Sequence, residues 1–162
     1  MASMKNVVLL AGVLLSAPAV FAQRASLPAT IISADRLRAI GDSLPPAASR
    51  TAQLARGSGY TYALTHRDSS GGIERHRDWT DVFVVESGSA TMLTGGVNEG
   101  AQETTSGEWR GGTLRGATSA PIKVGDIVEV PAGTPHQMLL RSGERISYLA
   151  IKIATAAADR TP

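Results

Sequence analysis

The sequence is broken into many short apolar segments by Gly, Pro, Ser and Asp, and this punctuation restricts the fold more than any other feature. The segments have the length and composition of β-strands. They lie at residues 60–65, 73–76, 82–85, 90–93, 127–130, 138–140 and 146–153. Many short strands at such spacing predict an all-β sandwich or barrel.

Between the fourth and fifth segments lies a long stretch rich in Gly, Thr and Ser. Ser87-Gly88-Ser89 and Thr94-Gly95-Gly96 are typical of tight turns between strands. Loops longer than about 12–15 residues are uncommon without a functional or structural reason. We therefore predict that residues 95–121 form an irregular hairpin over one mouth of the barrel.

A short helix is predicted before the strands. Ser33 suits its N-cap, Leu37 and Ile40 fall on one face, and Gly41 and the Pro-Pro pair at 45–46 suit its end. The predicted organisation is a signal peptide at 1–22, an N-terminal segment with the helix at 23–55, a β-barrel at 56–155 and a tail at 156–162.

The first 22 residues have the pattern of a secretory signal peptide. Lys5 precedes an apolar run at 7–15, and Val20 and Ala22 occupy the two positions that a signal peptidase reads. A membrane anchor needs about 20 consecutive apolar residues, so we predict cleavage after Ala22, a periplasmic or secreted protein, and no membrane attachment of the cleaved chain. The sequence contains no Cys, which excludes disulfides and cysteine-linked lipids.

The charge pattern argues against a nucleic-acid partner. The formal net charge is only +2, no run of Lys or Arg occurs, and aromatic residues make up 4%, whereas nucleic-acid binding favours clustered cations with stacking rings. Cys is absent, and neither a Gly-x-Ser-x-Gly elbow nor a glycine-rich phosphate loop occurs. We therefore expect neither covalent catalysis nor nucleotide chemistry.

Residues 73–88 suit a strand, a turn and a second strand. Because side chains alternate along a strand, Glu74 and His76 project to one side, while Asp81 shares a face with Phe83 and Val85. If the two strands are adjacent, Glu74, His76 and Asp81 converge.

A rigid corner precedes the third histidine of the chain. Pro131 and Pro135 restrict the backbone, and Gly133 permits a conformation closed to other residues. The corner therefore presents the next side chain, His136, in a fixed direction, as a metal ligand requires.

The spacing Gly125-x5-Pro131-x-Gly133-x2-His136 is similar to the second motif of the cupin superfamily, and His76-x4-Asp81-x6-Gly88 resembles the first. The resemblance covers about residues 56–155. It implies a single cupin jelly-roll barrel and a divalent metal ion, Mn, Fe, Zn or Ni, held by ligands at Glu74, His76, Asp81 and His136.

Three positions depart from the cupin motifs. Glu74 stands where a first histidine is usual, Asp81 replaces the usual glutamate, and Leu140 replaces the usual asparagine. Two carboxylates with two imidazoles would neutralise a divalent ion, so bound water would be less polarised than in a three-histidine site. If Asp81 is too short, a carboxylate and two histidines remain, the facial arrangement of non-haem iron sites.

Each candidate also has a purely structural interpretation. Glu74 suits a solvated strand position, Asp81 suits a turn cap, and His66 suits the surface. A weaker hypothesis assigns substrate contacts to Phe83, Trp109 and Arg110; the alternative is that Trp109 plugs the barrel end while Glu108 pairs with Arg110 or Arg115.

Two classes of function remain open from the sequence. One is a metal-dependent enzyme acting on a small polar molecule, of isomerase, dioxygenase or lyase type. The other is a non-catalytic cupin that binds a small ligand or a metal as a sensor, carrier or scavenger. Residues 82–85 lack polar alternation, so the outer face of that strand also needs cover, from the N-terminal segment or from a second protomer. We therefore expect a homodimer.

Overall fold

A computed structural model describes residues 28–45 and 49–155. The described residues from Ile32 onward belong to one compact unit, and residues 28–31 belong to another. The predicted signal peptide and the predicted tail lie outside the described residues. Within them, no helix has the length and apolar character needed to cross a membrane.

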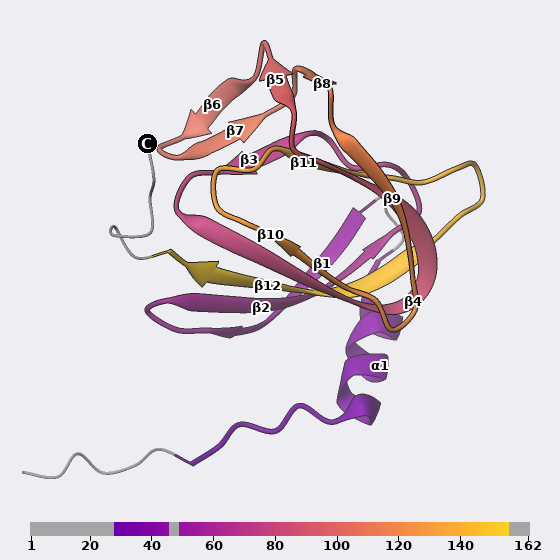
Figure 1. The fold of residues 1–162 in the computed structure, drawn as a ribbon. Coiled ribbons are helices and arrows are strands. Elements are labelled where there is room, and N and C mark those ends of the chain that lie inside the picture. Colours follow the sequence, from indigo (N-terminus) through magenta and orange to yellow (C-terminus); the bar gives the residue numbers. More distant parts are fainter. Residues whose placement is uncertain (1–27, 46–48, 156–162) are drawn as a thin grey trace, which may run out of the picture. The chain divides into compact units, whose positions relative to one another are not determined.

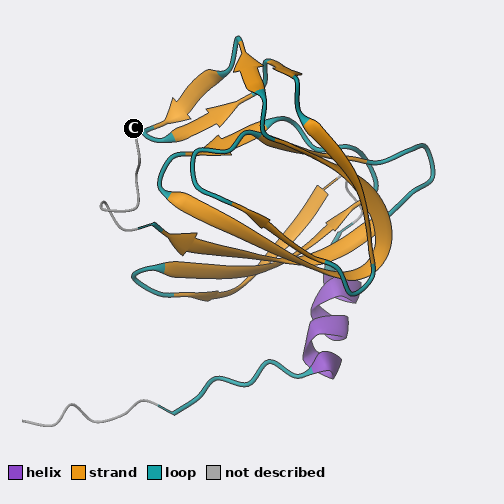
Figure 2. Ribbon diagram, viewed as in Figure 1, coloured by secondary structure: helices purple, strands orange, loops and turns teal. Residues whose placement is uncertain are grey.

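One helix and twelve strands make up the described chain (Figures 1 and 2). The helix is α1 (Ala34–Ser43), and the strands are β1 (Ser49–Arg56), β2 (Tyr60–Arg67), β3 (Glu74–His76), β4 (Trp79–Thr94), β5 (Val97–Glu99), β6 (Gln102–Thr105), β7 (Glu108–Arg110), β8 (Thr113–Arg115), β9 (Thr118–Lys123), β10 (Ile127–Val130), β11 (His136–Leu139) and β12 (Ile146–Ala154). The expectation of an all-β chain with a short N-terminal helix is confirmed.

Helix α1 begins as its sequence predicts. The Ser33 side chain accepts a hydrogen bond from the backbone N–H of Arg36 at 3.2 Å, which satisfies one of the free donors of the first turn. The helix continues past Gly41 to Ser43, two residues beyond the predicted end.

All strands pair antiparallel, and the long strand β4 connects two walls. Its first part pairs with β12 and β10, and its last part pairs with β9 and β11. We call β1, β2, β12, β10 and the first part of β4 the cation wall, and β3, β6, β7, β9, β11 and the last part of β4 the ligand wall. Figure 1 shows β4 curling from one to the other.

The predicted turn at Ser87-Gly88-Ser89 is wrong, because β4 runs through it as a single strand of 16 residues. Gly88 has φ 75°, and a Cβ there would lie 1.9 Å from the Arg145 carbonyl oxygen. The pairing of β12 with β4 also shifts between Ser147 and Tyr148. Gly88 therefore bends a continuous strand and does not end it.

The predicted irregular hairpin at 95–121 is instead a set of short strands. Strands β5 and β8 pair with each other, and β6 pairs with β7, which joins β3 in the ligand wall. The apolar content of these strands is low, so the strand pattern could not be recognised from the sequence. Strand β1 was missed for the same reason, and its pairing with β2 extends the sheet back to Ser49.

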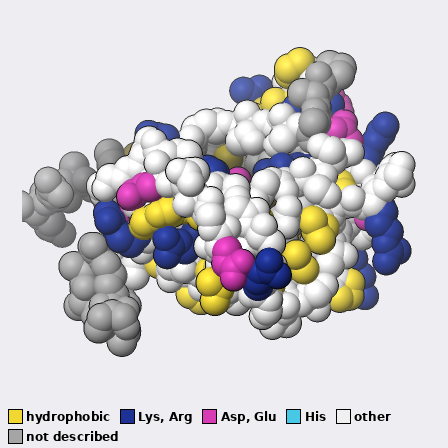
Figure 3. All heavy atoms as spheres, turned by 90° about the horizontal axis from the view of Figure 1, so that it is seen from above, with side chains coloured by type: hydrophobic (Ala, Val, Ile, Leu, Met, Phe, Trp, Pro, Cys, Tyr) yellow, Lys and Arg dark blue, Asp and Glu magenta, His cyan; other side chains and the backbone are white. Residues whose placement is uncertain are grey.

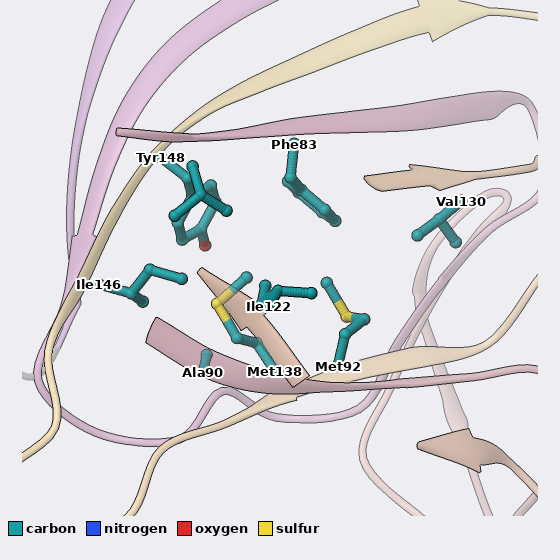
Figure 4. Close-up of a cluster of buried hydrophobic side chains, with 9 residues drawn as sticks. Phe83, Ala90, Met92, Ile122, Val130, Met138, Ile146 and Tyr148 are labelled. Carbon is teal, nitrogen blue, oxygen red and sulfur yellow. The ribbon is translucent and has the colours of Figure 1, made fainter. Parts of the chain in front are cut away.

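The apolar core lies between the two walls. Side chains from both walls point toward one another in Figure 4. The buried cluster consists of Phe83, Val85, Ala90, Met92, Ile122, Val130, Met138, Ile146 and Tyr148. The Phe83 and Tyr148 rings meet edge to face with centroids 5.3 Å apart, a favoured aromatic geometry.

Candidate metal centre

Glu74, His76 and His136 come together at one end of the core. One possible ligand atom of each lies within 4.8 Å of the others. His76 and His136 are only 2% and 4% exposed, and their ring centroids are 5.4 Å apart. Burial of two imidazoles beside a half-buried carboxylate is costly unless their polar atoms are satisfied, so the cluster needs a cation or protons.

The pairing of short strands in the ligand wall places these side chains. Glu74 lies opposite His136 on β11 and opposite Arg110 on β7, and His76 lies opposite Glu108. Alternation along β3 turns Glu74 and His76 to the same face, as predicted.

The corner before His136 is fixed by hydrogen bonds to the first motif, residues 76–88. The Gly133 N–H donates to the His76 carbonyl oxygen at 2.7 Å, and the Ala132 N–H donates to Thr80 Oγ1 at 3.3 Å. Gly133 has φ 82°, a conformation that favours glycine. The His136 Nδ1 atom lies 3.2 Å from the Thr134 carbonyl oxygen; because a carbonyl only accepts, Nδ1 carries the proton and Nε2 is free to ligate.

A third carboxylate orients His76. Glu108 Oε2 lies 2.5 Å from His76 Nδ1, so Nδ1 donates to Glu108 and Nε2 faces the cluster. Arg110 joins the two acids of this wall, with Nη1 3.2 Å from Glu74 Oε2 and Nη2 3.4 Å from Glu108 Oε2. A carboxylate behind a ligating histidine fixes the ring orientation and raises its basicity.

The surroundings of His76 Nε2 are the clearest evidence that the cluster binds a cation. It is buried without a hydrogen-bond partner among the described residues, yet Asp81 Oδ2 and Glu74 Oε2 lie 3.2 and 3.4 Å away. A lone pair facing two carboxylates is repulsive, and either a proton or a metal ion relieves it. The chemistry of the residues therefore fits a divalent metal ion, and the Glu74, His76 and His136 cluster can hold one.

The pKa values follow from the same contacts. Burial lowers the pKa of His76, but the Asp81 and Glu74 carboxylates beside its ring favour the protonated form and raise that pKa to about 9. Burial raises the pKa of Glu74, but the adjacent His76 ring and the charge of Arg110 bring that pKa down to about 2. Burial lowers the pKa of His136. Without metal at neutral pH, His76 is thus protonated, Glu74 is ionised and His136 is neutral.

Asp81 belongs to the cation wall and reaches the cluster from the opposite side. We predicted its convergence with Glu74 and His76 from adjacent strands, but β3 does not pair with the first part of β4; the two walls face each other instead. Asp81 Oδ2 lies 3.5 Å from His136 Nε2, and Oδ1 accepts a hydrogen bond from Lys152 Nζ at 2.7 Å. Asp81 is therefore shared between the histidines and a lysine.

A cavity of about 550 Å³ opens beside the cluster. Its lining includes Glu74, Asp81, Glu108 and His136, together with Phe83, whose ring centroid lies 6.1 Å from that of His136. Figure 3 shows the molecule from above, with its surface hollowed near the centre of the view. A metal ion at the cluster would therefore face open space.

The weaker candidates have different surroundings. Trp109 alternates with Glu108, so it lies on the other face of β7, where the Arg75 guanidinium stacks 3.8 Å from its ring centroid. Neither Trp109 nor Arg110 is among the residues that line the cavity. The alternative pairing of Glu108 with Arg110 is present. His66 also lies away from the cluster, with Nδ1 2.7 Å from Ser147 Oγ.

Two site residues were not predicted from the sequence, Glu108 as the partner of His76 and Lys152 as the partner of Asp81. Lys152 had a recognisable signal, because it shares the period-2 face of Tyr148 and Ala150 on β12. A charged residue on an otherwise core-facing series suggests a polar partner inside. Glu108 gave no such signal, since its place depends on the pairing of two three-residue strands.

Several solved structures are similar to this chain in fold. The cupin domain of Schizosaccharomyces pombe Cnp3 matches with a TM-score of 0.53 at 10% identity, over 70% of this chain and 71% of that one. The polyketide cyclase RemF from Streptomyces resistomycificus matches at 0.48 and 13%, over 65% of each chain. A cupin 2 conserved barrel domain protein from Rhodopseudomonas palustris matches at 0.47 and 19%, over 69% of this chain and 63% of that one.

This chain thus spans less than two thirds of the length of the RemF and Rhodopseudomonas structures. No family model matches the sequence, and the comparison with curated proteins gives no match.

Proposed function

This chain has the cupin fold, and we propose that it binds one divalent metal ion through Glu74, His76 and His136 and acts with it as an enzyme on a small polar molecule. The observation that carries the proposal is the cavity beside the cluster. Structural metal sites are closed by protein ligands, whereas catalytic sites keep a position open. Three protein ligands facing a cavity fit the second kind.

The donor set narrows the choice of metal. Two imidazoles and one carboxylate with open positions form the facial arrangement that holds non-haem Fe(II) in oxygenases. Asp81 could act as a fourth ligand, but its carboxylate also pairs with the Lys152 ammonium group, which offsets its negative charge. We therefore propose Fe²⁺ as the bound ion, with Mn²⁺, Zn²⁺ and Ni²⁺ as the alternatives.

Different residues of the chain would orient the ligands of this ion and exclude water from it. When bound, it would polarise a substrate oxygen or activate O₂. Glu108 holds His76 at Nδ1, Thr134 holds His136 at Nδ1, and Arg110 keeps Glu74 ionised. Phe83 and the apolar cluster exclude water from the far side.

The test is metal content followed by turnover. Residues 23–162 are purified after growth with added Mn, Fe, Ni and Zn, and the bound metal is measured before screens for oxygen uptake, isomerisation and lyase activity. We expect one metal per chain and turnover in one of the screens. Absence of any bound metal would overturn the metal site, and bound metal without turnover across the panel would favour the sensor, carrier or scavenger.

We also propose that the protein is exported. The support is the signal-peptide pattern of residues 1–22 in the sequence. Fractionation of a bacterial host that expresses the whole chain tests this. A periplasmic product beginning at Gln23 would agree with export, and an uncleaved cytoplasmic product would contradict it.

The outer face of the cation wall supports the proposal of a homodimer. Helix α1 lines one groove on it beside Leu64, but Tyr60, Tyr62, Ile127 and Ile153 are 37–68% exposed. The two tyrosine rings stack with centroids 5.0 Å apart. Exposed tyrosine and isoleucine side chains that the helix leaves uncovered suit the same face of a second copy.

Sedimentation of the mature protein tests the homodimer. We expect a dimer that Tyr62→Glu dissociates, while Val124→Glu, a change at an exposed residue elsewhere, leaves it intact. A monomeric wild type at micromolar concentration would contradict it.

A further inference from the structure

A row of polar side chains crosses the cation wall at the mouth of the cavity. Arg56 on β1 pairs with Thr61 on β2, Thr61 pairs with Lys152 on β12, and Lys152 pairs with Asp81 on β4. All four line the cavity. The row therefore leads from Asp81 beside the metal cluster to Arg56 at the edge of the sheet. We call it the polar row.

The next row explains why the space beside it is hollow. Ala63 pairs with Ala150, and Ala150 pairs with Phe83. Two methyl side chains in the middle of the wall leave the room that larger residues would fill. A ligand in the cavity would lie over these two alanines, with the polar row on one side and the metal cluster opposite.

The two cations of the row differ in their partners. Lys152 Nζ has three N–H donors and gives one to Asp81 at 2.7 Å, so two remain. Arg56 makes no ion pair with any of the described residues. By contrast, Arg67 at the other end of the cavity donates from Nε to the Tyr148 hydroxyl at 2.9 Å.

The charge of the lining favours an anion once a metal is present. Arg56, Arg67 and Lys152 balance the lining acids Glu74, Asp81 and Glu108. With neutral histidines, a divalent ion leaves two positive charges in excess. A concave surface with walls of low dielectric strengthens the attraction for an anionic ligand.

The spacing of the row suits a single carboxylate between its two cations. Adjacent strands lie about 4.8 Å apart, so the backbones at Arg56 and Lys152 are about 10 Å apart. Both side chains are long enough to reach a group between them. Lys152 lies one strand from Asp81, so the same short molecule can also approach the metal cluster.

We infer that the cavity binds a small carboxylic acid, with its carboxylate between Lys152 and Arg56 and a second oxygen toward the metal. The inference rests on the proposed metal site and names the substrate class for it. Lys152 has two roles in this arrangement, since it holds Asp81 and contacts the ligand.

The test is calorimetric titration of the mature, metal-loaded protein with malonate, succinate and glutarate, each compared with its uncharged diamide. We expect at least one acid to bind at least tenfold more tightly than its diamide. Lys152→Met should weaken that binding by about 10–100-fold and Arg56→Met by about tenfold, because each removes a charge-assisted hydrogen bond. Lys123→Met, a surface lysine outside this cavity, should leave it unchanged.

Metal content is measured for every variant and after every titration, which separates the two proposals. If the wild type holds metal but none of the three acids binds, or each diamide binds as tightly as its acid, the carboxylate site is wrong and the metal site stands. The carboxylate site is equally wrong if Lys152→Met and Arg56→Met both keep metal and bind the acid like the wild type. If the wild type holds no metal, both proposals fail.

Discussion

The two walls of the barrel use charge in different ways. In the ligand wall, Glu74, His76, Glu108 and Arg110 are bound to one another by contacts of 2.5–3.4 Å, so each side chain is fixed by its neighbours. In the cation wall, Asp81 and Lys152 form one pair, and Arg56 has no acidic partner among the described residues. A closed network orients ligands for an ion, whereas an open row leaves donors for a molecule that arrives from outside.

The largest expected effect comes from removing a histidine of the ligand wall. His76→Ala or His136→Ala deletes one of three ligands, and we expect the bound metal to fall from about one per chain to nearly none, measured by elemental analysis. His66→Ala is the matched control, because His66 pairs with Ser147 away from the cluster. Loss of metal in His66→Ala alone would contradict the assignment.

A smaller effect is expected when the partner of a ligand is changed. Glu108→Gln keeps the shape but removes the charge that His76 Nδ1 faces, and metal affinity should fall about 10–100-fold in a competition titration with a chelator. Glu99→Gln, at an exposed acid paired with Arg115, should have no effect. Equal affinities for wild type and Glu108→Gln would mean that Glu108 does not support His76.

These residues show how far the sequence alone could lead. Alternation placed Glu74 with His76, and the Pro-Gly-Pro corner identified His136, because both signals are local. The bend at Gly88 and the partner Glu108 depend on contacts with Arg145 and His76 that are distant in sequence. Such pairings are set by tertiary packing, which a single sequence does not display.

The apparent metal affinity should depend on pH through a single proton. The pKa of His76 is raised to about 9 without metal, while Glu74 is already ionised and His136 already neutral at pH 7. Metal must displace the His76 proton, so affinity should rise about tenfold per pH unit up to about pH 9 and then level off. Proton release measured in buffers of different ionisation enthalpy should approach one per metal; zero release would contradict this.

The stability of the metal-free protein should show the opposite trend. A raised pKa means that folding favours protonated His76, so His76 adds to the free energy of unfolding. This contribution is fully present below the unfolded pKa of about 6.5 and is lost as pH rises through about 9. Urea denaturation of the metal-free protein at several pH values measures it. A contribution that instead grew over this window would contradict the raised pKa.

The smallest expected effect concerns Gly88, the glycine at which β4 passes from one wall to the other, and Gly143 is its matched control. Gly143→Ala places a side chain at φ 82° in open space, and it should cost about 1–2 kcal/mol of unfolding free energy. Gly88→Ala has a similar φ but also meets the Arg145 carbonyl, so it should cost more. Equal losses in urea denaturation would show that β4 does not need the close approach at Gly88.

The central claim is that Glu74, His76 and His136 share one ion that faces the cavity. An anomalous difference map from crystals of the metal-loaded mature protein tests it most directly. We predict one strong peak about 2.0–2.3 Å from a ligand atom of each of the three residues. A peak bound elsewhere, or none at this cluster in metal-loaded crystals, would contradict the account.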